Sequence, residues 1–323
     1  MKYKIILVSL LVSSCGGGSS GNNLNNDETL SPSTPLPLSE NCVDIGSNVQ
    51  RCSFVHDGLD RYYLIQDSHP EAEGLSSIIF NLHGFGSNAL EQMQYTSLNT
   101  YTYTKEKNFI LIHPQGAPLE TFLTSSASHW NSGGWTIGSS VDDVNFIDTI
   151  IELVSNKHDI NMNRIYSTGM SNGGFMSYHL ACNLSSKIAA VASVTGSMSE
   201  QTFESCNPQH STSVLQIHGT LDTTVPFNGN PSLGMEPIKK VVTFWQEYNS
   251  CNVEPLISST DFFDLGYSIE HSQHTNCINN QQVELYKVEG MRHVWPAADR
   301  FGISASEIIW EFFNTYDING KIN

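Results

Sequence analysis

Short runs rich in β-branched and aromatic residues alternate along this chain with longer segments of helical period, and this alternation constrains its fold most. A strand that rejoins its sheet through a helix runs parallel to the strand before it. The pattern therefore predicts the α/β class, with a mostly parallel central sheet flanked by helices. Seven runs are expected to be strands: Arg61–Gln66, Ser77–Leu82, Phe109–His113, Arg164–Thr168, Ala190–Val194, Val214–His218 and Val283–Val288.

Two helices are indicated by the residues at their starts. The first follows Asp142 and Asp143, which we expect to cap it, and has apolar residues every three or four positions over 144–154. The second follows Ser304 and Glu307, which are spaced as a capping box before an apolar segment.

The N-terminus has the pattern of an export signal. Lys2 and Lys4 precede the apolar run Ile5–Val12, which is shorter than the roughly 20 residues that cross a bilayer. Val12–Cys15 resembles a bacterial lipoprotein cleavage site, in which the cysteine becomes the acylated first residue of the mature chain. We expect residues 1–15 to be a lipoprotein signal peptide and Cys15 to anchor the protein to a membrane, in the periplasm or at the cell surface. The alternative is an ordinary signal peptide and a freely secreted protein.

Residues 16–40 have the composition of a flexible tether. They are rich in Gly, Ser, Asn, Thr and Pro, with almost nothing apolar to bury. The rest, residues 41–323, is expected to form one catalytic domain, because the chain of 323 residues is 39% hydrophobic and long enough for one extensive core.

The chain is strongly acidic, with a formal net charge of −17. Such a chain repels phosphate backbones, so nucleic acid is not expected as a partner. The charge is expected to keep the protein soluble, with adaptation to a salty medium as the alternative, and it identifies no substrate. The sequence leaves the oligomeric state open.

Six cysteines remain when Cys15 is set aside, an even number in an exported and therefore disulfide-permissive protein. None has the C-x-x-C spacing of zinc or redox sites. The sequence allows several pairings, and the grouping along the chain favours Cys42–Cys52, Cys182–Cys206 and Cys251–Cys277.

Gly169–Gly173 matches G-x-S-x-G, the pattern of a nucleophile elbow, in which glycines permit a tight turn that exposes a serine. The pattern alone is weak, since Gly17–Gly21 in the tether matches it too. Only the copy at Gly169–Gly173 follows a predicted strand and precedes a helix-like segment, Gly174–Leu180. Ser171 is therefore the predicted nucleophile.

A serine nucleophile needs a histidine base and an orienting carboxylate, which follow the serine in the order acid, then histidine, in folds with this elbow. Asp222 follows the strand Val214–His218, and His293 follows the strand Val283–Val288. We expect Asp222 to be the acid and His293 the base, the alternative being that His293 lies in a surface loop. Other histidines are excluded because they precede Ser171 or lie too near Asp222 on one strand: His83, His113, His129 and His218.

Hydrolysis also needs donors for the oxyanion that develops on the substrate. One is expected to be the backbone N–H of Asn172, directly after the nucleophile. The other is expected from the glycine-containing segment His83–Ser87, with the N–H of Phe85 as the donor. A plain tight turn is the alternative for this segment.

Three tryptophans are candidates for the substrate pocket, because large rigid rings line many ligand sites. Core packing is an equal alternative for Trp130 and Trp135. Trp295 is the stronger candidate, since it lies close to His293 in the sequence.

Several motifs in this order resemble the poly(3-hydroxybutyrate) depolymerase-like esterases, which are related to feruloyl and acetylxylan esterases. The resemblance covers about residues 60–300 and implies an α/β-hydrolase fold, with Ser171, Asp222 and His293 in the roles already inferred. One departure is Gly290-Met291-Arg292, where relatives more often have a run of glycines. The motifs are HGFGSN at His83–Asn88, WNSGGW at Trp130–Trp135, VDDVNFI at Val141–Ile147, GMSNGG at Gly169–Gly174, HGTLDTTVPFNG at His218–Gly229 and HVWP at His293–Pro296.

The expected function is hydrolysis of a carboxylic ester through an acyl-serine intermediate, without metal or organic cofactor. The first substrate class is a polyester oligomer of the polyhydroxyalkanoate type, and feruloyl or acetylxylan esters of plant polysaccharide are the alternative. Relatives that attack solid polyester often carry an additional binding domain. This sequence ends soon after its final predicted helix, so soluble esters or oligomers are the expected substrates. A peptidase or acyltransferase with the same triad and a non-catalytic surface binding protein are the remaining alternatives.

Overall fold

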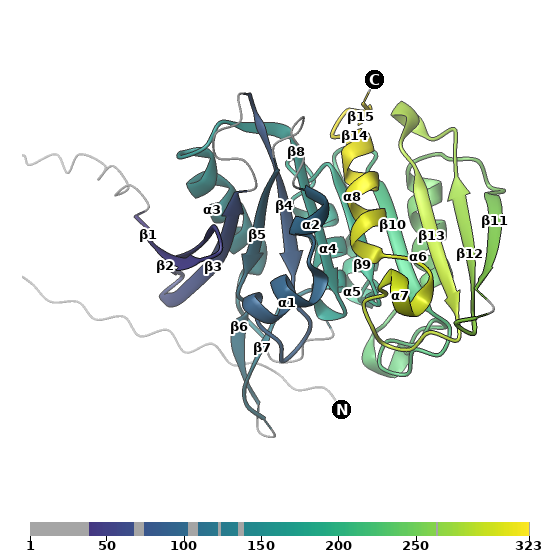
Figure 1. The fold of residues 1–323 in the computed structure, drawn as a ribbon, viewed down its shortest axis with the longest axis horizontal. Helices are drawn as coiled ribbons and strands as arrows, with labels where there is room; N and C mark the ends of the chain where they lie inside the picture. The colour runs from purple at the N-terminus through teal and green to yellow at the C-terminus, as the bar shows by residue number, and fades with distance from the viewer. Residues whose placement is uncertain are drawn as a thin grey trace, which may run out of the picture. The chain divides into compact units, whose positions relative to one another are not determined.

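Within the described residues, all seven runs predicted as strands lie in one sheet of 11 strands (Figure 1). The computed structural model describes residues 39–67, 74–102, 109–121, 124–134, 139–262 and 264–322. These residues belong to one folded unit, Leu38–Asn323. The predicted signal peptide with Cys15, residues 16–38 of the predicted tether, and Trp135 lie outside the described residues.

The middle of the sheet is parallel, as predicted, and antiparallel strands extend both edges. The run at Arg61–Gln66 lies in an antiparallel strand. The parallel strands are, in spatial order, β5 (Phe109–Pro114), β4 (Ser76–Leu82), β8 (Ile160–Met170), β9 (Ala190–Val194), β10 (Ser213–Gly219) and β13 (Val283–Glu289). Beside β5 lie β3 (Leu59–Asp67), β2 (Val49–His56) and β1 (Asn41–Gly46), and beside β13 lie β12 (Tyr267–His274) and β11 (Leu256–Phe262). Separate pairs are β6 (Ala117–Thr121) with β7 (Thr124–His129) and β14 (Tyr316–Asp317) with β15 (Gly320–Lys321).

Helices connect the strands and cover the sheet. Among the described residues, no helix combines the length and the apolar character needed to cross a membrane. The α-helices are α1 (Ala89–Thr96), α2 (Asn99–Thr102), α3 (Asp143–Ser155), α4 (Asn172–Asn183), α5 (Glu200–Ser205), α6 (Ile238–Tyr248), α7 (Ala298–Phe301) and α8 (Ala305–Thr315). Short 3₁₀ turns are η1 (Pro231–Leu233) and η2 (Ile278–Asn280).

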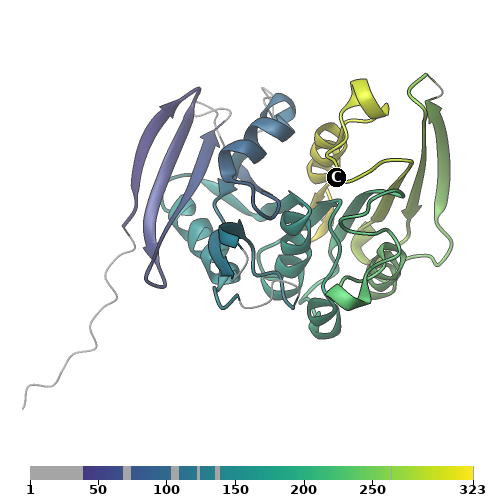
Figure 2. The same cartoon turned by 90° about the horizontal axis from the view of Figure 1, so that it is seen from below.

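The parallel strands are buried on both faces. Successive side chains of a strand point to opposite sides of the sheet, so each strand packs in two cores. In β4, Ile78 and Phe80 pack in the core that includes α3, α4 and α6, whereas Ile79 packs in the core that includes α8. Figure 2 shows α1 and α8 on one side of the sheet and α3 and α4 on the other. Burial on both faces explains why these strands are continuous apolar runs in the sequence.

The predicted helix starts are confirmed at α3 and α8, with one correction. The side chain of Asp142 caps α3, and that of Ser304 caps α8, each by accepting a backbone N–H of the first turn. The prediction that Asp143 is also a cap is wrong. Its carboxylate is buried and pairs with Arg61 of β3, a partner 82 residues away in sequence.

The structure contains the three disulfides favoured by the spacing of the cysteines. Cys42–Cys52 joins β1 to β2. Cys182–Cys206 joins the end of α4 to the residue after α5. Cys251–Cys277 joins the loop after α6 to the loop after β12. The predicted pairing is therefore confirmed, and it indicates an exported protein, since such bonds persist in oxidising compartments.

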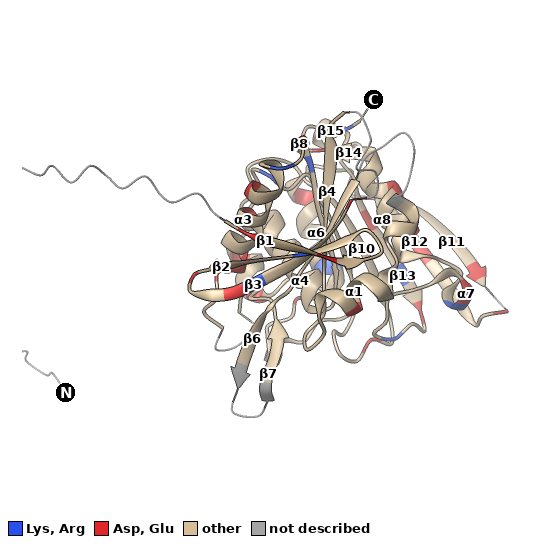
Figure 3. Cartoon of the chain, turned by 60° about the vertical axis from the view of Figure 1, so that its left-hand side comes forward, with Lys and Arg blue, Asp and Glu red and all other residues tan. Residues whose placement is uncertain are grey.

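Asp and Glu residues, red on the ribbon of Figure 3, are spread over many elements of the described chain. Asp and Glu together number 32, against 15 Lys and Arg. A spread of like charge favours solubility over binding to one basic partner surface.

Candidate active site

Ser171 lies at the sharp turn between β8 and α4. Its backbone has φ 54° and ψ −119°, a conformation that residues with a side chain rarely adopt. Two backbone bonds hold this strained turn: the N–H of Ser171 donates to the carbonyl of Val194 on β9 (2.9 Å), and its carbonyl accepts the N–H of Phe175 (3.0 Å). The turn therefore presents Ser171 at the C-terminal end of the parallel strands.

Two glycines allow this turn by letting backbones approach closely. A Cβ on Gly169 would lie 2.5 Å from the carbonyl carbon of Gly173, and a Cβ on Gly173 would lie 2.1 Å from the carbonyl oxygen of Leu82. Neither distance leaves room for a side chain. The G-x-S-x-G spacing thus packs the start of α4 against the end of β4, from which the segment with Phe85 begins.

Asp222 and His293 meet because β10 and β13 are parallel neighbours. The loop after β10 carries Asp222 and the loop after β13 carries His293, so both residues lie at the C-terminal ends of these strands. His293 Nδ1 lies 2.7 Å from Asp222 Oδ2. The other oxygen, Oδ1, accepts the backbone N–H groups of Thr224 and Val225, each at 2.9 Å. The side chain of Asp222 is fully buried, whereas that of His293 is 20% exposed. The carboxylate is thus fixed by its own loop and turned toward the histidine.

Burial of Asp222 by itself raises the pKa of its carboxyl. The hydrogen bond and charge of His293, together with the N–H of Val225, act in the opposite direction and hold the pKa below its ordinary value. Asp222 is therefore ionised at neutral pH. An ionised acceptor keeps the proton of His293 on Nδ1 and leaves Nε2 able to accept another.

His218 is held as a neutral side chain next to Asp222. Its Nδ1 lies 3.0 Å from the amide nitrogen of Gln216, and its Nε2 lies 2.8 Å from the carbonyl of Val225. Since the amide nitrogen only donates, Nε2 carries the proton and donates to the carbonyl. Burial lowers the pKa of His218 to about 4. Tyr178 of α4 donates to Gln216 (2.8 Å). These buried hydrogen bonds connect the loop that carries Asp222 to the helix after Ser171.

The two residues predicted to supply oxyanion donors lie close to Ser171: Asn172 follows it directly, and Phe85 lines the same pocket. Asn172 is the first residue of α4, where backbone N–H groups have no acceptor within the helix. Phe85 lies in the segment after β4, which touches Ser171: a Cβ on Gly84 would lie 3.5 Å from the Cβ of Ser171. The structure therefore places both segments beside the serine.

The side chain of His83 and the backbone N–H of Ser87 (3.1 Å) both bond to the carbonyl of Gly84 and so orient the N–H of Phe85. His83 Nε2 accepts the backbone N–H of Gly116 (2.9 Å), so its Nδ1 carries the proton and donates to the carbonyl of Gly84 (2.8 Å). Burial lowers the pKa of His83 to about 4, which keeps this tautomer neutral. The carbonyl of Gly84 and the N–H of Phe85 belong to one planar trans peptide and point in opposite directions. Fixing the carbonyl of Gly84 therefore also fixes the direction of the N–H of Phe85.

A pocket of about 590 Å³ contains both Ser171 and His293. One wall is α1, which sequence reasoning missed, although Asn88 followed by Glu91 three residues later is a helix-start signal. The exposed ring of Tyr95 and the carboxylate of Glu91 lie on this wall. The lining residues are Gly84, Phe85, Ser87, Glu91, Gln92, Gln94, Tyr95, Met170, Ser171 and His293.

Trp130 and Trp295 do not line this pocket. Trp130 is fully buried, and its indole N–H donates to the carbonyl of His83 (2.9 Å). Trp295 is 5% exposed and donates from its indole to Ser306 of α8 (3.0 Å). Both rings are in the core because a partner inside the protein satisfies each N–H. The prediction for Trp135 lies outside the described residues.

Buried histidines make the stability of this fold sensitive to acid. Burial lowers the pKa of His83, His179 and His218 to about 4 and that of His113 to about 3, against 6.5 in the unfolded chain. Between these values the unfolded chain binds more protons, so the free energy of unfolding should fall as pH falls from 6.5 to 4. Each histidine contributes up to about 1.4 kcal/mol per pH unit.

Urea unfolding at a series of pH values measures this slope. In His113→Leu the slope should be smaller by the contribution of one proton, because both ring nitrogens of His113 are buried and lack hydrogen-bond partners among the described residues. An unchanged slope in this variant would contradict the assignment.

The chain matches the sequence model of the phospholipase/carboxylesterase family over residues 68–261, more than half of its length. It is 28% identical over 173 residues to feruloyl esterase B of Piromyces equi, covering 49% of this chain and 31% of that protein. It is 27% identical over 199 residues to a probable feruloyl esterase C of Aspergillus niger, covering 60% and 66%. The chain thus spans less than two thirds of the length of both relatives.

A solved structure shows the same fold. The acetyl xylan esterase from Aspergillus awamori superposes with a TM-score of 0.53 at 14% identity, covering 85% of this chain and 99% of that one. At this identity the likeness concerns the fold alone, and it confirms the predicted α/β-hydrolase architecture. The family match, together with the elbow at Ser171 and the sheet that carries it, shows that this chain belongs to the phospholipase/carboxylesterase family of α/β-hydrolases.

Proposed function

We propose that this protein is a serine carboxylic-ester hydrolase with Ser171 as nucleophile, His293 as base and Asp222 as the orienting acid. One observation carries the proposal: His293 bonds to the buried Asp222 at 2.7 Å and lines one pocket with the strained Ser171. The family and the related feruloyl esterases support it.

The reaction follows from the protonation of His293. While His293 keeps its Nδ1 proton in the hydrogen bond to Asp222, its Nε2 takes the proton of Ser171 Oγ as this oxygen attacks the ester carbonyl. The backbone N–H groups of Phe85 and Asn172 stabilise the oxyanion. His293 then gives its proton to the leaving alcohol, and an acyl-Ser171 ester remains. Water, deprotonated by His293, releases the acid and restores Ser171.

The substrate class is the less defined part of the proposal. The exposed rings of Phe85 and Tyr95 offer apolar faces in the pocket, which suits an aromatic acyl group such as a feruloyl group. The carboxylate of Glu91 lines the same pocket and disfavours an anionic chain end, as carried by a 3-hydroxybutyrate oligomer. We therefore place phenolic esters ahead of polyester oligomers, which reverses the order favoured by the motifs alone.

Export and anchoring are part of the same proposal. The three disulfides support an oxidising compartment outside the cytoplasm. We assign residues 1–15 to a lipoprotein signal peptide, Cys15 to lipid attachment, residues 16–40 to a tether and residues 41–323 to the catalytic domain. Labelling of the protein by a radioactive fatty acid, lost in Cys15→Ser, would test the anchor.

The test of function is kcat/KM of the purified protein on methyl ferulate, soluble 3-hydroxybutyrate oligomers, acetylated xylan and a short nitrophenyl ester. Ser171→Ala serves as the blank. A preference for methyl ferulate supports phenolic esters as the substrate class, and a preference for the oligomers overturns that choice. Turnover of none of the four esters would contradict an ester hydrolase.

A further inference from the structure

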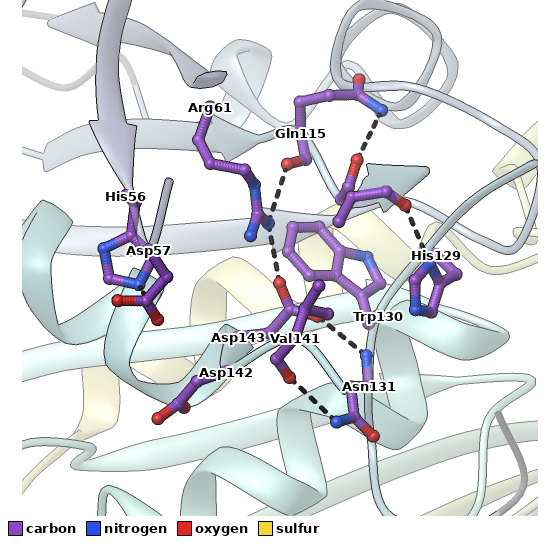
Figure 4. Close-up of polar contacts among 12 residues, drawn as sticks. His56, Asp57, Arg61, Gln115, His129, Trp130, Asn131, Val141, Asp142 and Asp143 are labelled. Carbon is purple, nitrogen blue, oxygen red and sulfur yellow. Dashed lines mark hydrogen bonds and ion pairs between the residues drawn. The ribbon is translucent and has the colours of Figure 1, made fainter. Parts of the chain in front are cut away.

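A buried ion pair joins β3 to the first residue of α3 (Figure 4). Arg61 is 4% exposed and Asp143 is 1% exposed, and Arg61 Nη2 lies 2.7 Å from Asp143 Oδ1. The guanidinium also lies 3.7 Å from the centre of the Phe146 ring and donates to the carbonyl of Gln115 (3.2 Å). Removing two charges from water is costly, and such pairs often add little to stability. A contribution to folding stability therefore does not by itself explain this buried pair.

The second oxygen of Asp143 reaches the segment between β7 and α3. Asp143 Oδ2 accepts the backbone N–H of Asn131 at 2.8 Å. The side chain of Asn131 donates to the carbonyl of Val141 at 2.9 Å, which ties the same residue to the turn before α3 (Figure 4). Arg61 fixes the carboxylate from the other side. The ion pair thus holds Asn131, which lies outside regular secondary structure, in one place.

Asn172 bonds to the peptide between Trp130 and Asn131 from the side opposite Asp143. The N–H of Asn131 and the carbonyl of Trp130 belong to one planar peptide and point in opposite directions. Asn172 Nδ2 donates to that carbonyl (3.0 Å), and Asn172 Oδ1 accepts the N–H of Trp130 (2.7 Å). A single peptide is therefore clamped between Asp143 and the residue whose own N–H is the first proposed oxyanion donor.

The indole of Trp130 connects this peptide to the second proposed donor. Its N–H donates to the carbonyl of His83 at 2.9 Å, and its ring centre lies 5.0 Å from that of the His83 imidazole. His83 in turn orients the peptide that carries the N–H of Phe85. Trp130 thus contacts both segments that provide a donor.

We infer that Arg61, Asp143 and Trp130 are positioning residues, which hold the backbone N–H groups of Phe85 and Asn172 at a fixed separation around the oxyanion. This inference rests on the proposed function. Oxyanion stabilisation depends on donors that are already placed before reaction, so a small displacement acts on the transition state more than on substrate binding. None of the three side chains lines the pocket with Ser171.

The test compares two identical chemical changes, Trp130→Phe and Trp245→Phe. Both indoles are fully buried, but the N–H of Trp245 on α6 has no hydrogen-bond partner among the described residues. Trp130→Phe should lower kcat by about 10- to 100-fold with KM unchanged, because the donors are displaced but not removed. Affinity for phenylboronic acid, which forms a tetrahedral adduct with the serine, should fall by a similar factor. Trp245→Phe should change kcat by less than about 3-fold.

A second variant tests whether the ion pair acts through the same peptide. Asp143→Asn should also lower kcat with KM unchanged, and the double variant with Trp130→Phe should lose less than the product of the two effects. Equal kcat in the two tryptophan variants, or multiplying effects in the double variant, would overturn the inference. Wild-type protein without turnover above Ser171→Ala would instead contradict the proposed function, so the two failures are distinguishable.

Discussion

Replacing Ser171 by alanine is expected to lower kcat/KM by about 10³-fold or more, since the acyl intermediate can no longer form. The elbow should remain, because its backbone is held by bonds to Val194 and Phe175 that do not involve the hydroxyl. Substrate affinity should change little for the same reason. Steady-state kinetics on the preferred ester measures the loss.

Ser177→Ala is the matched control for this variant. Ser177 lies on the same helix, is fully buried and bonds through Oγ to Ser167 (2.9 Å) and to the carbonyl of Gly173 (3.0 Å). It removes a hydroxyl close to the elbow but not the nucleophile, so kcat/KM should stay within about 5-fold of wild type. A similar loss in both variants would mean that Ser171 acts through folding and not through chemistry.

Asp222→Asn is expected to lower kcat by about 10⁴-fold, from the typical effect of a wrong histidine tautomer. The structure determines how the new amide would lie. Oδ1 of residue 222 accepts two backbone N–H groups, from Thr224 and Val225, so the amide oxygen must stay there and the NH₂ group must face His293. His293 Nδ1 would then accept a hydrogen bond in place of donating one. Nε2 would carry the remaining proton and could not take that of Ser171.

The loss in Asp222→Asn should appear in kcat while the folded structure is kept, which thermal unfolding and circular dichroism check. Asp261→Asn makes the same change of charge on β11, where the side chain is exposed, and should leave kcat unchanged. If Asp222→Asn kept more than a tenth of the wild-type kcat, Asp222 would not set the tautomer of the base.

Local sequence signals were sufficient where a structural feature depends on neighbouring residues. The parallel strands are apolar runs bounded by turn residues, and Gly169 and Gly173 are required by close backbone approach at the elbow. The cysteines pair with partners at most 26 residues away, so their grouping predicted the disulfides. The edge strands were missed because β1 and β11 are mostly exposed and lack an apolar pattern.

What the sequence by itself determined is the α/β-hydrolase fold, the elbow with Ser171 and the chain order of Asp222 and His293 after their own strands, because each depends on residues close in sequence. Only the tertiary structure decided that Asp222 and His293 meet, that Trp130 and Trp295 are core residues, and that Asp143 pairs with Arg61. The physical reason is that a polar atom is satisfied by whichever partner the fold brings near it, and these partners lie 11 to 82 residues away.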